Sequence, residues 1–281
     1  MNRRQILAAA AMLAASPVVP AIAGDAPAVP IKVRVRRTGW AGIQVERGDK
    51  ALFVDPEVIF YKRPELGIKS VALDTQAGSR YVALTHLHGD HFDPDAIKSI
   101  LKSPGDLVIC HEKMAASIAA QQFPVAGVAM YEPYSAGNYE EDDIALAAVP
   151  AQDGYGDLQV SWVIVAGGVR MIHCGDTIWH GDWLKIGRIY GPFDLAFLPI
   201  NGFRQSTEIY PVSTVAKSMG PEEAAQAALL LRAKAAVPIH YGRKPRPSYL
   251  ETENALNLFV AAAGRAGVKP LVSEPGAWID L

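Results

Sequence analysis

The stretch that decides the fold is Thr85-His86-Leu87-His88-Gly89-Asp90-His91-Phe92-Asp93, which holds three of the seven histidines of the 281-residue chain. It lies between an apolar run, residues 81–84, and an expected helix start at Asp93-Pro94. A strand end before and a helix start after such a cluster are typical of a loop that carries ligands. We therefore interpret residues 85–93 as a ligand loop, and the rest of the chain as its scaffold.

The spacing within the ligand loop indicates metal chemistry. His86 and His88 are two residues apart, so on an extended segment both imidazoles leave the same side and can share one ion. Asp90 and His91 follow Gly89, which permits a tight turn, and return to the same space, where they suit a second ion. A neutral imidazole suits zinc, and a carboxylate adds charge and helps to orient water.

The H-x-H-x-D-H pattern resembles the signature of the metallo-β-lactamase superfamily. The resemblance implies an α/β fold, a four-layer αβ/βα sandwich in a single domain with a one- or two-metal site at one edge. By pattern, the lactonase-like and N-acyl-phosphatidylethanolamine phospholipase D-like branches are the most similar. The resemblance covers most of the chain after residues 1–23.

Three further roles follow from this resemblance. The superfamily has a Gly-Asp-Thr segment whose aspartate bridges two metals, and Asp176 stands in that place. Its last ligand histidine follows a strand, as His240 does here, and would hold the second metal together with Asp90 and His91. An aspartate like Asp55, at the end of the opening hairpin, supports the ligand loop in the superfamily.

The third ligand of the first metal departs from the family pattern. Related sequences carry a histidine after the Val-Pro-Ala strand end, whereas this chain has Asp153. Three interpretations stay open. Asp153 is the ligand, which we prefer, because aspartate also binds zinc; or His180 replaces it; or the first site is weak and one ion does the work.

For the remaining histidines, the sequence favours roles other than metal binding, and for the cysteines it leaves their pairing open. Alternation along a strand places His173 on the face opposite Asp176, so we expect packing or support from it. His111 follows a predicted strand directly and could face the site, but a capping or solvated role is favoured. Cys110 and Cys174 are too few for a disulfide framework, and the sequence does not decide whether they pair.

The first 23 residues have the layout of an export signal. Arg3 and Arg4 precede an alanine-rich apolar run, and residues 21–23 form a small-x-small cleavage site. The arginine pair resembles a twin-arginine signal. Pro17 and Pro20 break the apolar run short of the roughly 20 residues that a membrane span needs. An uncleaved membrane anchor is the alternative, but we expect cleavage, no stable membrane span and a periplasmic protein.

After a linker at residues 24–30, residues 31–281 are expected to form one hydrolase domain. With 50% hydrophobic residues the chain can bury a substantial core. Its formal charge of −2 becomes −4 without the leader, because 25 basic residues then face 29 acidic ones. No basic patch indicates a nucleic-acid partner. The sequence does not give the oligomeric state.

The hydrophobic pattern predicts strands that alternate with helices in each half of the domain. Strands are expected at residues 31–37, 43–45, 51–54, 81–84, 107–110, 125–131, 144–149, 158–165, 169–173, 194–200 and 235–239, and near Val268 and Trp278. Helices are expected at residues 94–101, 111–121, 221–234 and 251–263, with another starting near Trp183.

The predicted function is metal-dependent hydrolysis of a small-molecule or lipid-like substrate. Two Zn²⁺ ions, with Mn²⁺ or Fe²⁺ as alternatives, would lower the pKa of a bridging water and give a hydroxide that attacks an ester, lactone or phosphodiester. Asp90 would orient the hydroxide and move a proton, and His180 would donate to the oxyanion. Trp40, Trp179, Phe203 and Tyr210 are candidates for an apolar pocket.

Two other classes of function remain open. Di-iron oxidoreductases that work with flavin occur in this fold, but they resemble H-x-E-x-D, and His88 occupies the position of the glutamate. A non-catalytic periplasmic metal-binding protein is the other alternative, and it applies if Asp153 disables the first site.

Overall fold

Residues 32–136, 144–205 and 213–281 are described by the computed structural model. The predicted leader at residues 1–23, the linker at 24–30 and Tyr210 therefore lie outside the described residues. Within the described ranges, no helix is long and apolar enough to cross a membrane.

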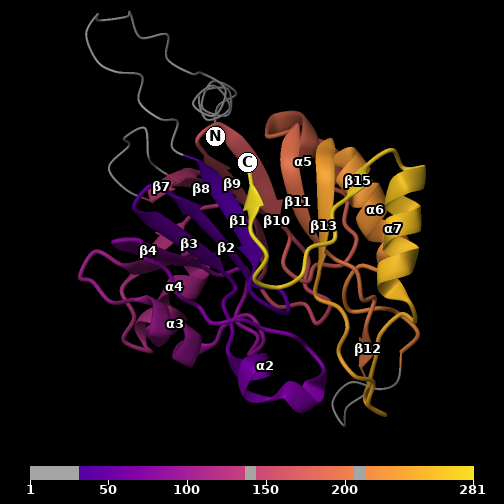
Figure 1. Ribbon diagram of the computed structural model, residues 1–281, viewed down its shortest axis with the longest axis horizontal. Coiled ribbons are helices and arrows are strands. Elements are labelled where there is room, and N and C mark those ends of the chain that lie inside the picture. The colour runs from indigo at the N-terminus through magenta and orange to yellow at the C-terminus, as the bar shows by residue number, and fades with distance from the viewer. Residues whose placement is uncertain (1–31, 137–143, 206–212) are drawn as a thin grey trace, which may run out of the picture.

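Two mixed seven-stranded sheets form the centre of the fold (Figure 1). The first has the order β16 (Ile279–Asp280), β1 (Val33–Arg37), β2 (Ile43–Arg47), β3 (Lys50–Val54), β4 (Ser79–Ala83), β5 (Leu107–His111) and β6 (Val125–Val128). The second has the order β15 (Lys269–Pro270), β13 (Ala233–Ile239), β11 (Phe193–Pro199), β10 (Val169–His173), β9 (Val160–Ala166), β8 (Ile144–Pro150) and β7 (Pro133–Ala136).

Apolar residues from both sheets fill the space between them. Leu52 and Val54 of β3 belong to the same buried cluster as Trp162 and Ile164 of β9. Strand β9 is buried along nearly its whole length, as expected for a strand covered on both faces. The alternation predicted for β1 is also present, since Val33 is buried while Arg34 is exposed.

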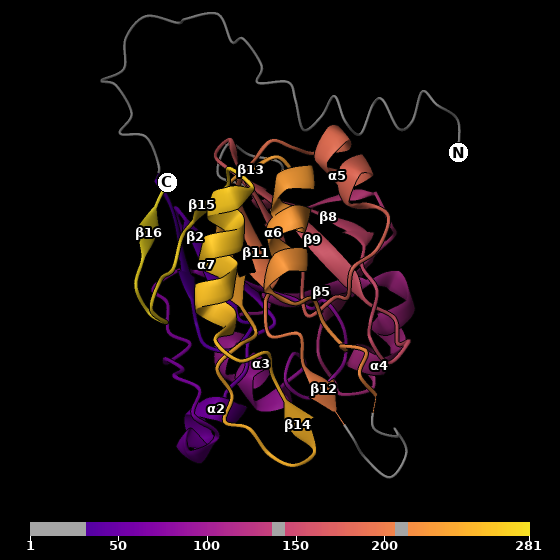
Figure 2. The same cartoon turned by 90° about the vertical axis from the view of Figure 1, so that its right-hand side faces the viewer.

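Most helical segments cover the outer faces of the two sheets, whereas Phe60 and Leu66, in the helical segments at residues 59–66, belong to the central cluster. The helical segments are α2 (Ile59–Lys62), η1 (Pro64–Leu66), α3 (Pro94–Ile100), η2 (Glu112–Met114), α4 (Ala115–Ala119), α5 (Trp183–Ile189), α6 (Pro221–Leu230) and α7 (Ala255–Arg265). Ile97 of α3 packs in one cluster with Val108 of β5, and Ala228 of α6 packs with Ala236 of β13. Figures 1 and 2 show α6 and α7 on the outer side of the second sheet. The four-layer αβ/βα sandwich predicted from the sequence is confirmed.

Three predicted helices end or begin elsewhere. The helix predicted over 221–234 ends at Leu230, because Arg232 has a φ of 61° and the chain turns into β13. The helix predicted over 251–263 begins at Ala255, after Asn254 with a φ of 53°. The segment predicted as one helix over 111–121 divides into η2 and α4.

A two-stranded sheet, β12 (Arg204–Gln205) with β14 (Tyr249–Leu250), lies beside the main sandwich. It joins two loops that follow β11 and β13, and Figure 2 shows it at the lower end of the molecule. This sheet could not be predicted from the sequence, because a strand of two residues is too short to show an alternating hydrophobic pattern. Both of its strands contribute to the pocket described below.

Candidate metal centre and active site

The ends of strands β4, β8, β10 and β13 deliver polar side chains to one place. Strands β10, β11 and β13 are parallel to one another, so their carboxyl ends share one edge of the second sheet, where parallel sheets commonly bind ligands. All seven residues predicted as metal ligands come together there. They form one group of His86, His88, Asp153 and Asp176, and a second group of Asp90, His91 and His240, each with its ligand atoms within 4.8 Å of one another.

In the first group, the two histidines of the H-x-H pattern face each other. His86 Nε2 lies 3.0 Å from His88 Nδ1 and 3.6 Å from Asp176 Oδ1. Asp153 Oδ2 lies 3.6 Å from His88 Nδ1. The other oxygen of Asp153 accepts the backbone N–H of Tyr155 at 2.6 Å, which leaves Oδ2 directed at the histidines.

In the second group, His240 Nε2 lies 3.6 Å from Asp90 Oδ2, and His91 Nε2 lies 4.0 Å from the same oxygen. His240 has a φ of 54°, a backbone conformation that is uncommon for residues other than glycine and that is frequent at functional sites. That conformation directs the ring at the end of β13 toward the ligand loop.

Asp176 lies between the two groups. Its Oδ1 atom faces His86 of the first group at 3.6 Å. Its Oδ2 atom faces His91 at 3.9 Å and His240 at 3.8 Å, both in the second group. One carboxylate therefore presents a separate oxygen to each group, as a residue that bridges two ions would do.

The spacing and burial of these atoms fit metal ions. Pairs 3.6–4.0 Å apart are too long for hydrogen bonds, yet ligands at about 2.0–2.2 Å around a tetrahedral ion would lie about 3.4 Å apart. His91 Nε2, His240 Nε2 and Asp176 Oδ1 are buried atoms without a hydrogen-bond partner. Buried polar atoms of this kind call for a partner, and a bound cation would supply it.

Burial and charge set the protonation of the two buried loop histidines in opposite directions. Burial lowers the pKa of His86 to about 4, so this side chain is neutral near pH 7. Burial also opposes protonation of His91, but the carboxylates of Asp90, Asp55 and Asp176 outweigh it and raise the pKa of His91 to about 10. A positive charge is thus favoured in the middle of three carboxylates, which is the place that a cation would fill.

Asp55 supports the ligand loop from behind. It accepts hydrogen bonds from the backbone N–H of Thr85 at 2.8 Å and from the Thr85 hydroxyl at 2.6 Å. Its Oδ2 atom lies 2.8 Å from His91 Nδ1, so that nitrogen donates and Nε2 is left free for a ligand bond. The contact expected from Asp55 is therefore present, and Asp55 is fully buried.

Trp40 has a more direct contact with the centre than the sequence indicated. It is fully buried, and its Nε1–H donates to Asp90 Oδ2 at 3.1 Å. Its ring centroid lies 4.2 Å from that of His240, whose backbone N–H donates to the Trp40 carbonyl at 2.8 Å. Trp40 lies in the loop between β1 and β2. A single tryptophan in a loop does not indicate such a contact in the sequence, so only a place in an apolar pocket was predicted for it.

The structure does not place His180 as predicted. Its ring stacks on Trp183 with centroids 4.0 Å apart, and its Nδ1 accepts the backbone N–H of Asp182 at 3.2 Å. His180 is in neither ligand group and does not line the pocket described below. This geometry gives no support to His180 as an oxyanion donor or as a substitute for Asp153.

The other histidines and the cysteines behave as structural residues. His173 Nε2 donates to the Ala41 carbonyl at 2.8 Å, and His111 caps η2 by accepting from Lys113 N, both as expected. Cys110 and Cys174 are free and buried, in separate clusters on opposite sides of the sandwich. Burial raises the pKa of the Cys110 thiol to about 12, so it is inert.

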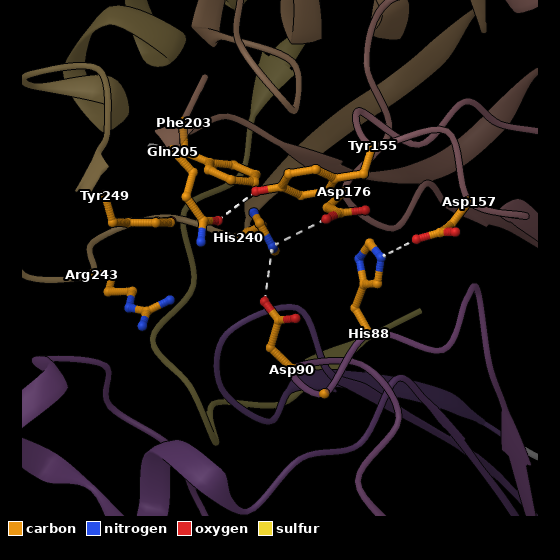
Figure 3. Close-up of a pocket in the computed structure, with 11 residues that line it drawn as sticks. His88, Asp90, Tyr155, Asp157, Asp176, Phe203, Gln205, His240, Arg243 and Tyr249 are labelled. Atoms are coloured by element: carbon orange, nitrogen blue, oxygen red, sulfur yellow. Dashed lines mark hydrogen bonds and ion pairs between the residues drawn. The ribbon is translucent and has the colours of Figure 1, made fainter. Parts of the chain in front are cut away.

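A pocket of about 400 Å³ opens over the centre (Figure 3). Its floor is formed by ligand-group residues, among them His88, Asp90, Asp176 and His240. Its walls are formed by Tyr155, Asp157, Phe203, Gln205, Arg243 and Tyr249, together with Gly89. Of the aromatic residues proposed for a pocket, Phe203 lines it, Trp40 lies buried, and Trp179 is not among the lining residues.

The family follows from comparison with known proteins. A family profile described as a beta-lactamase superfamily domain matches residues 53–241, a range that contains all seven residues of the two groups. The chain belongs to the metallo-β-lactamase superfamily. This metallo-β-lactamase superfamily member is 30% identical to a UPF0173 metal-dependent hydrolase of Thermococcus onnurineus, over 76% of its own length and 86% of the relative's.

A second relative and two solved structures agree with this placement. A UPF0173 metal-dependent hydrolase of Thermus thermophilus is 31% identical over 89% of this chain and 99% of its own. The metallo hydrolase Igni18 of Ignicoccus hospitalis superposes with a TM-score of 0.63 at 21% identity, covering 89% of this chain and 98% of its own. CmlA, a diiron β-hydroxylase of Streptomyces venezuelae, superposes with a TM-score of 0.65 at 15% identity, covering 91% of this chain and 55% of its own. The two structures show the shared fold, and the relatives place the protein among metal-dependent hydrolases.

Proposed function

We propose that this metal-dependent hydrolase uses a dinuclear, zinc-type centre to cleave an ester, lactone or phosphodiester bond of a small or lipid-like substrate. The observation that carries the proposal is the position of Asp176, whose two oxygens face the two ligand groups separately. His86, His88 and Asp153 would hold one ion, and Asp90, His91 and His240 the other. When bound, the two ions supply Lewis acidity and a water of lowered pKa.

The chain's own residues divide the remaining work. Asp90 is 31% exposed in its side chain and lines the pocket, so it can reach a water or a substrate. Its Oδ2 atom accepts from Trp40, which fixes the carboxylate and leaves Oδ1 free to move a proton. Phe203 and Tyr249 stack with centroids 5.2 Å apart and give one side of the pocket an apolar surface.

The direct test combines metal analysis with a hydrolysis screen on the purified, metal-loaded protein. We expect two zinc ions per chain and turnover of at least one class among lactones, phosphodiesters and aryl esters. Asp90→Ala and Asp176→Ala should abolish turnover while the circular dichroism spectrum stays that of a folded protein. Iron with a visible absorption band would favour the di-iron oxidoreductase instead. One tightly held ion without turnover would favour a binding protein.

A further inference from the structure

The pocket has an uneven distribution of charge. Asp157 lies beside His88 on one side, and Arg243 lies beside Tyr249 on the opposite side (Figure 3). Of the described residues that line the pocket, only Arg243 carries a fixed positive charge, because the other basic ones are histidines. A substrate with one charged end therefore meets two different walls.

Arg243 is held in place while its guanidinium stays available. Its backbone N–H donates to Glu251 Oε1 at 3.0 Å, and its guanidinium carbon lies 4.5 Å from the centroid of the Tyr249 ring. The carboxylate of Glu251 is occupied by the backbone of Gly242 and Arg243 and by the Tyr249 hydroxyl. Stacking of this kind orients the guanidinium plane without using its N–H donors.

The guanidinium of Arg243 has an unused donor. Its Nε atom is buried without a hydrogen-bond partner, and no ion pair joins Arg243 to any residue within the ranges that the structure describes. A buried donor without an acceptor is costly. Because that atom is buried, a ligand in the pocket binds the two Nη atoms instead, which hold no hydrogen bond to another described residue. The planar guanidinium can bind a carboxylate or phosphate through two parallel hydrogen bonds.

The charge of the metal centre makes this residue more important. Three carboxylates, those of Asp90, Asp153 and Asp176, stand in the two groups, and they cancel most of the charge of two divalent ions. An anion in the pocket is then attracted less by the centre, and it is repelled by Asp157, which is exposed on the opposite wall. The electrostatic preference of the pocket for an anion therefore depends on Arg243.

We propose that Arg243 selects substrates that carry an anionic group, a carboxylate or a phosphate, next to the bond that is cleaved. The anionic group binds the guanidinium of Arg243, and the scissile bond lies over Asp90 and Asp176. This inference rests on the proposed hydrolase function for its catalytic part. Its binding part is independent of turnover, because the pocket and Arg243 are present whether or not a bond is cleaved.

The binding test uses benzoate and phenyl phosphate as anionic probes and benzamide as a neutral one, measured by calorimetry on the metal-loaded protein. Arg243→Gln should lower the affinity for at least one anion by about 10-fold and leave the affinity for benzamide unchanged. Arg246→Gln is the matched control, because it removes the same charge from the same loop and Arg246 does not line the pocket. The two anions distinguish a carboxylate from a phosphate ligand.

Two results of the binding test overturn the proposal. Anions that bind Arg243→Gln as tightly as the unchanged protein are held by the metal centre rather than by Arg243. If neither benzoate nor phenyl phosphate binds the unchanged protein, the proposal is also overturned. Arg243→Lys should restore part of the affinity, because lysine keeps the charge and loses the planar fork. A purely structural role would instead lower the melting temperature of Arg243→Gln and spare the affinity of the folded protein.

The catalytic test compares 4-acetoxybenzoate with 4-acetoxybenzamide, which share the ester and differ in one charge. Arg243→Gln should raise KM about 10-fold for the benzoate alone and leave kcat nearly unchanged. An equal change for both esters would overturn the inference and leave the hydrolase function intact. If the unchanged protein hydrolyses no ester, lactone or phosphodiester, the proposed function is overturned. The binding test would still decide whether Arg243 binds an anionic group.

Discussion

His88 Nε2 lies 3.0 Å from Asp157 Oδ2, while His88 Nδ1 faces His86 in the first ligand group. The Nε2–H therefore donates to Asp157, which fixes the tautomer that leaves Nδ1 free for a metal. Carboxylates that orient ligand histidines in this way typically contribute about 10–100-fold in metal affinity. Asp157→Ala should accordingly lower the affinity for one of two bound ions by about 10-fold, as measured by titration against a competing chelator.

Asp95→Ala is the control for this prediction. Both aspartates are well exposed, at 68% for Asp157 and 65% for Asp95, and Asp95 pairs with Lys62 on the surface. Asp157→Asn should recover part of the affinity, because its amide oxygen can still accept from His88. Equal metal affinity in Asp157→Ala and the unchanged protein would show that His88 is oriented without Asp157.

The assignment of Asp153 leads to a second prediction. Asp153 Oδ2 lies 3.6 Å from His88 Nδ1, and burial together with nearby Asp176 raises the pKa of Asp153, as expected where carboxylates crowd together before a cation is bound. Asp153→Ala should lose about one ion per chain, whereas Asp153→His should retain both, since each side chain can ligate zinc. Atomic emission spectroscopy measures the number of metal ions per chain. Two ions per chain in Asp153→Ala would remove Asp153 from the ligand set.

The two groups of candidate ligands could be predicted because the residue types that bind metals, and their spacing, are visible in the sequence. The H-x-H-x-D-H pattern indicated the candidate ligands of the loop, and the resemblance supplied Asp153, Asp176 and His240 as further candidates, which the fold places in the same two groups as the loop residues. Gly89 was expected to provide a tight turn, yet it is not among the positive-φ glycines, and no atom lies within 4 Å of a Cβ placed there. The turn forms through the hydrogen bond from His91 N to His88 O.

The walls of the pocket could not be predicted in the same way. Gln205 and Tyr249 reach the pocket through the two-residue strands β12 and β14, whose pairing depends on the path of two loops. The roles expected of His180 find no support in the structure for a related reason. A histidine near the metal segment in sequence looks available, but packing on Trp183 takes its ring away from the pocket. Sequence spacing does not report which face a loop residue presents.

A third prediction concerns the hydrogen bond from Trp40 to Asp90. Trp40→Phe keeps an aromatic ring against His240 and removes the Nε1–H that donates to Asp90 Oδ2 at 3.1 Å. A charge-assisted hydrogen bond of this kind is worth roughly 1.5–3 kcal/mol, so we expect kcat to fall about 10-fold with two ions still bound. Steady-state kinetics and metal analysis on the same sample separate these effects. An unchanged kcat would mean that Trp40 only packs.

Phe60→Leu is the matched control for Trp40→Phe. Phe60 is buried, and its ring centroid lies 5.3 Å from that of Trp40, so the substitution disturbs the same packing without touching Asp90. Phe60→Leu should lower the melting temperature and leave kcat within about twofold. Equal losses of kcat in the two variants would attribute the effect to packing.

The last prediction concerns Glu57, which is 1% exposed and lies under Trp40. Its carboxylate accepts from the backbone N–H groups of Trp40 at 3.3 Å and Phe60 at 3.2 Å, and from the Ser70 hydroxyl. Burial, with a smaller contribution from Asp93, outweighs these bonds and raises the pKa of Glu57 from 4.5 to about 7. The folded protein therefore holds this proton more tightly than the unfolded chain does.

Protonation of Glu57 therefore stabilises the folded protein at low pH. The stabilisation linked to protonated Glu57 is complete below pH 4.5 and is lost as the pH rises to about 7, with a size of about 3 kcal/mol. Other carboxyl groups titrate in the same window, so the measurement is the difference in the free energy of unfolding between the unchanged protein and Glu57→Gln. Urea denaturation at pH 5 and pH 8 should give a difference that shifts in favour of glutamine at the higher pH. Parallel pH curves for the two proteins would mean that Glu57 ionises in the fold as easily as it does in water.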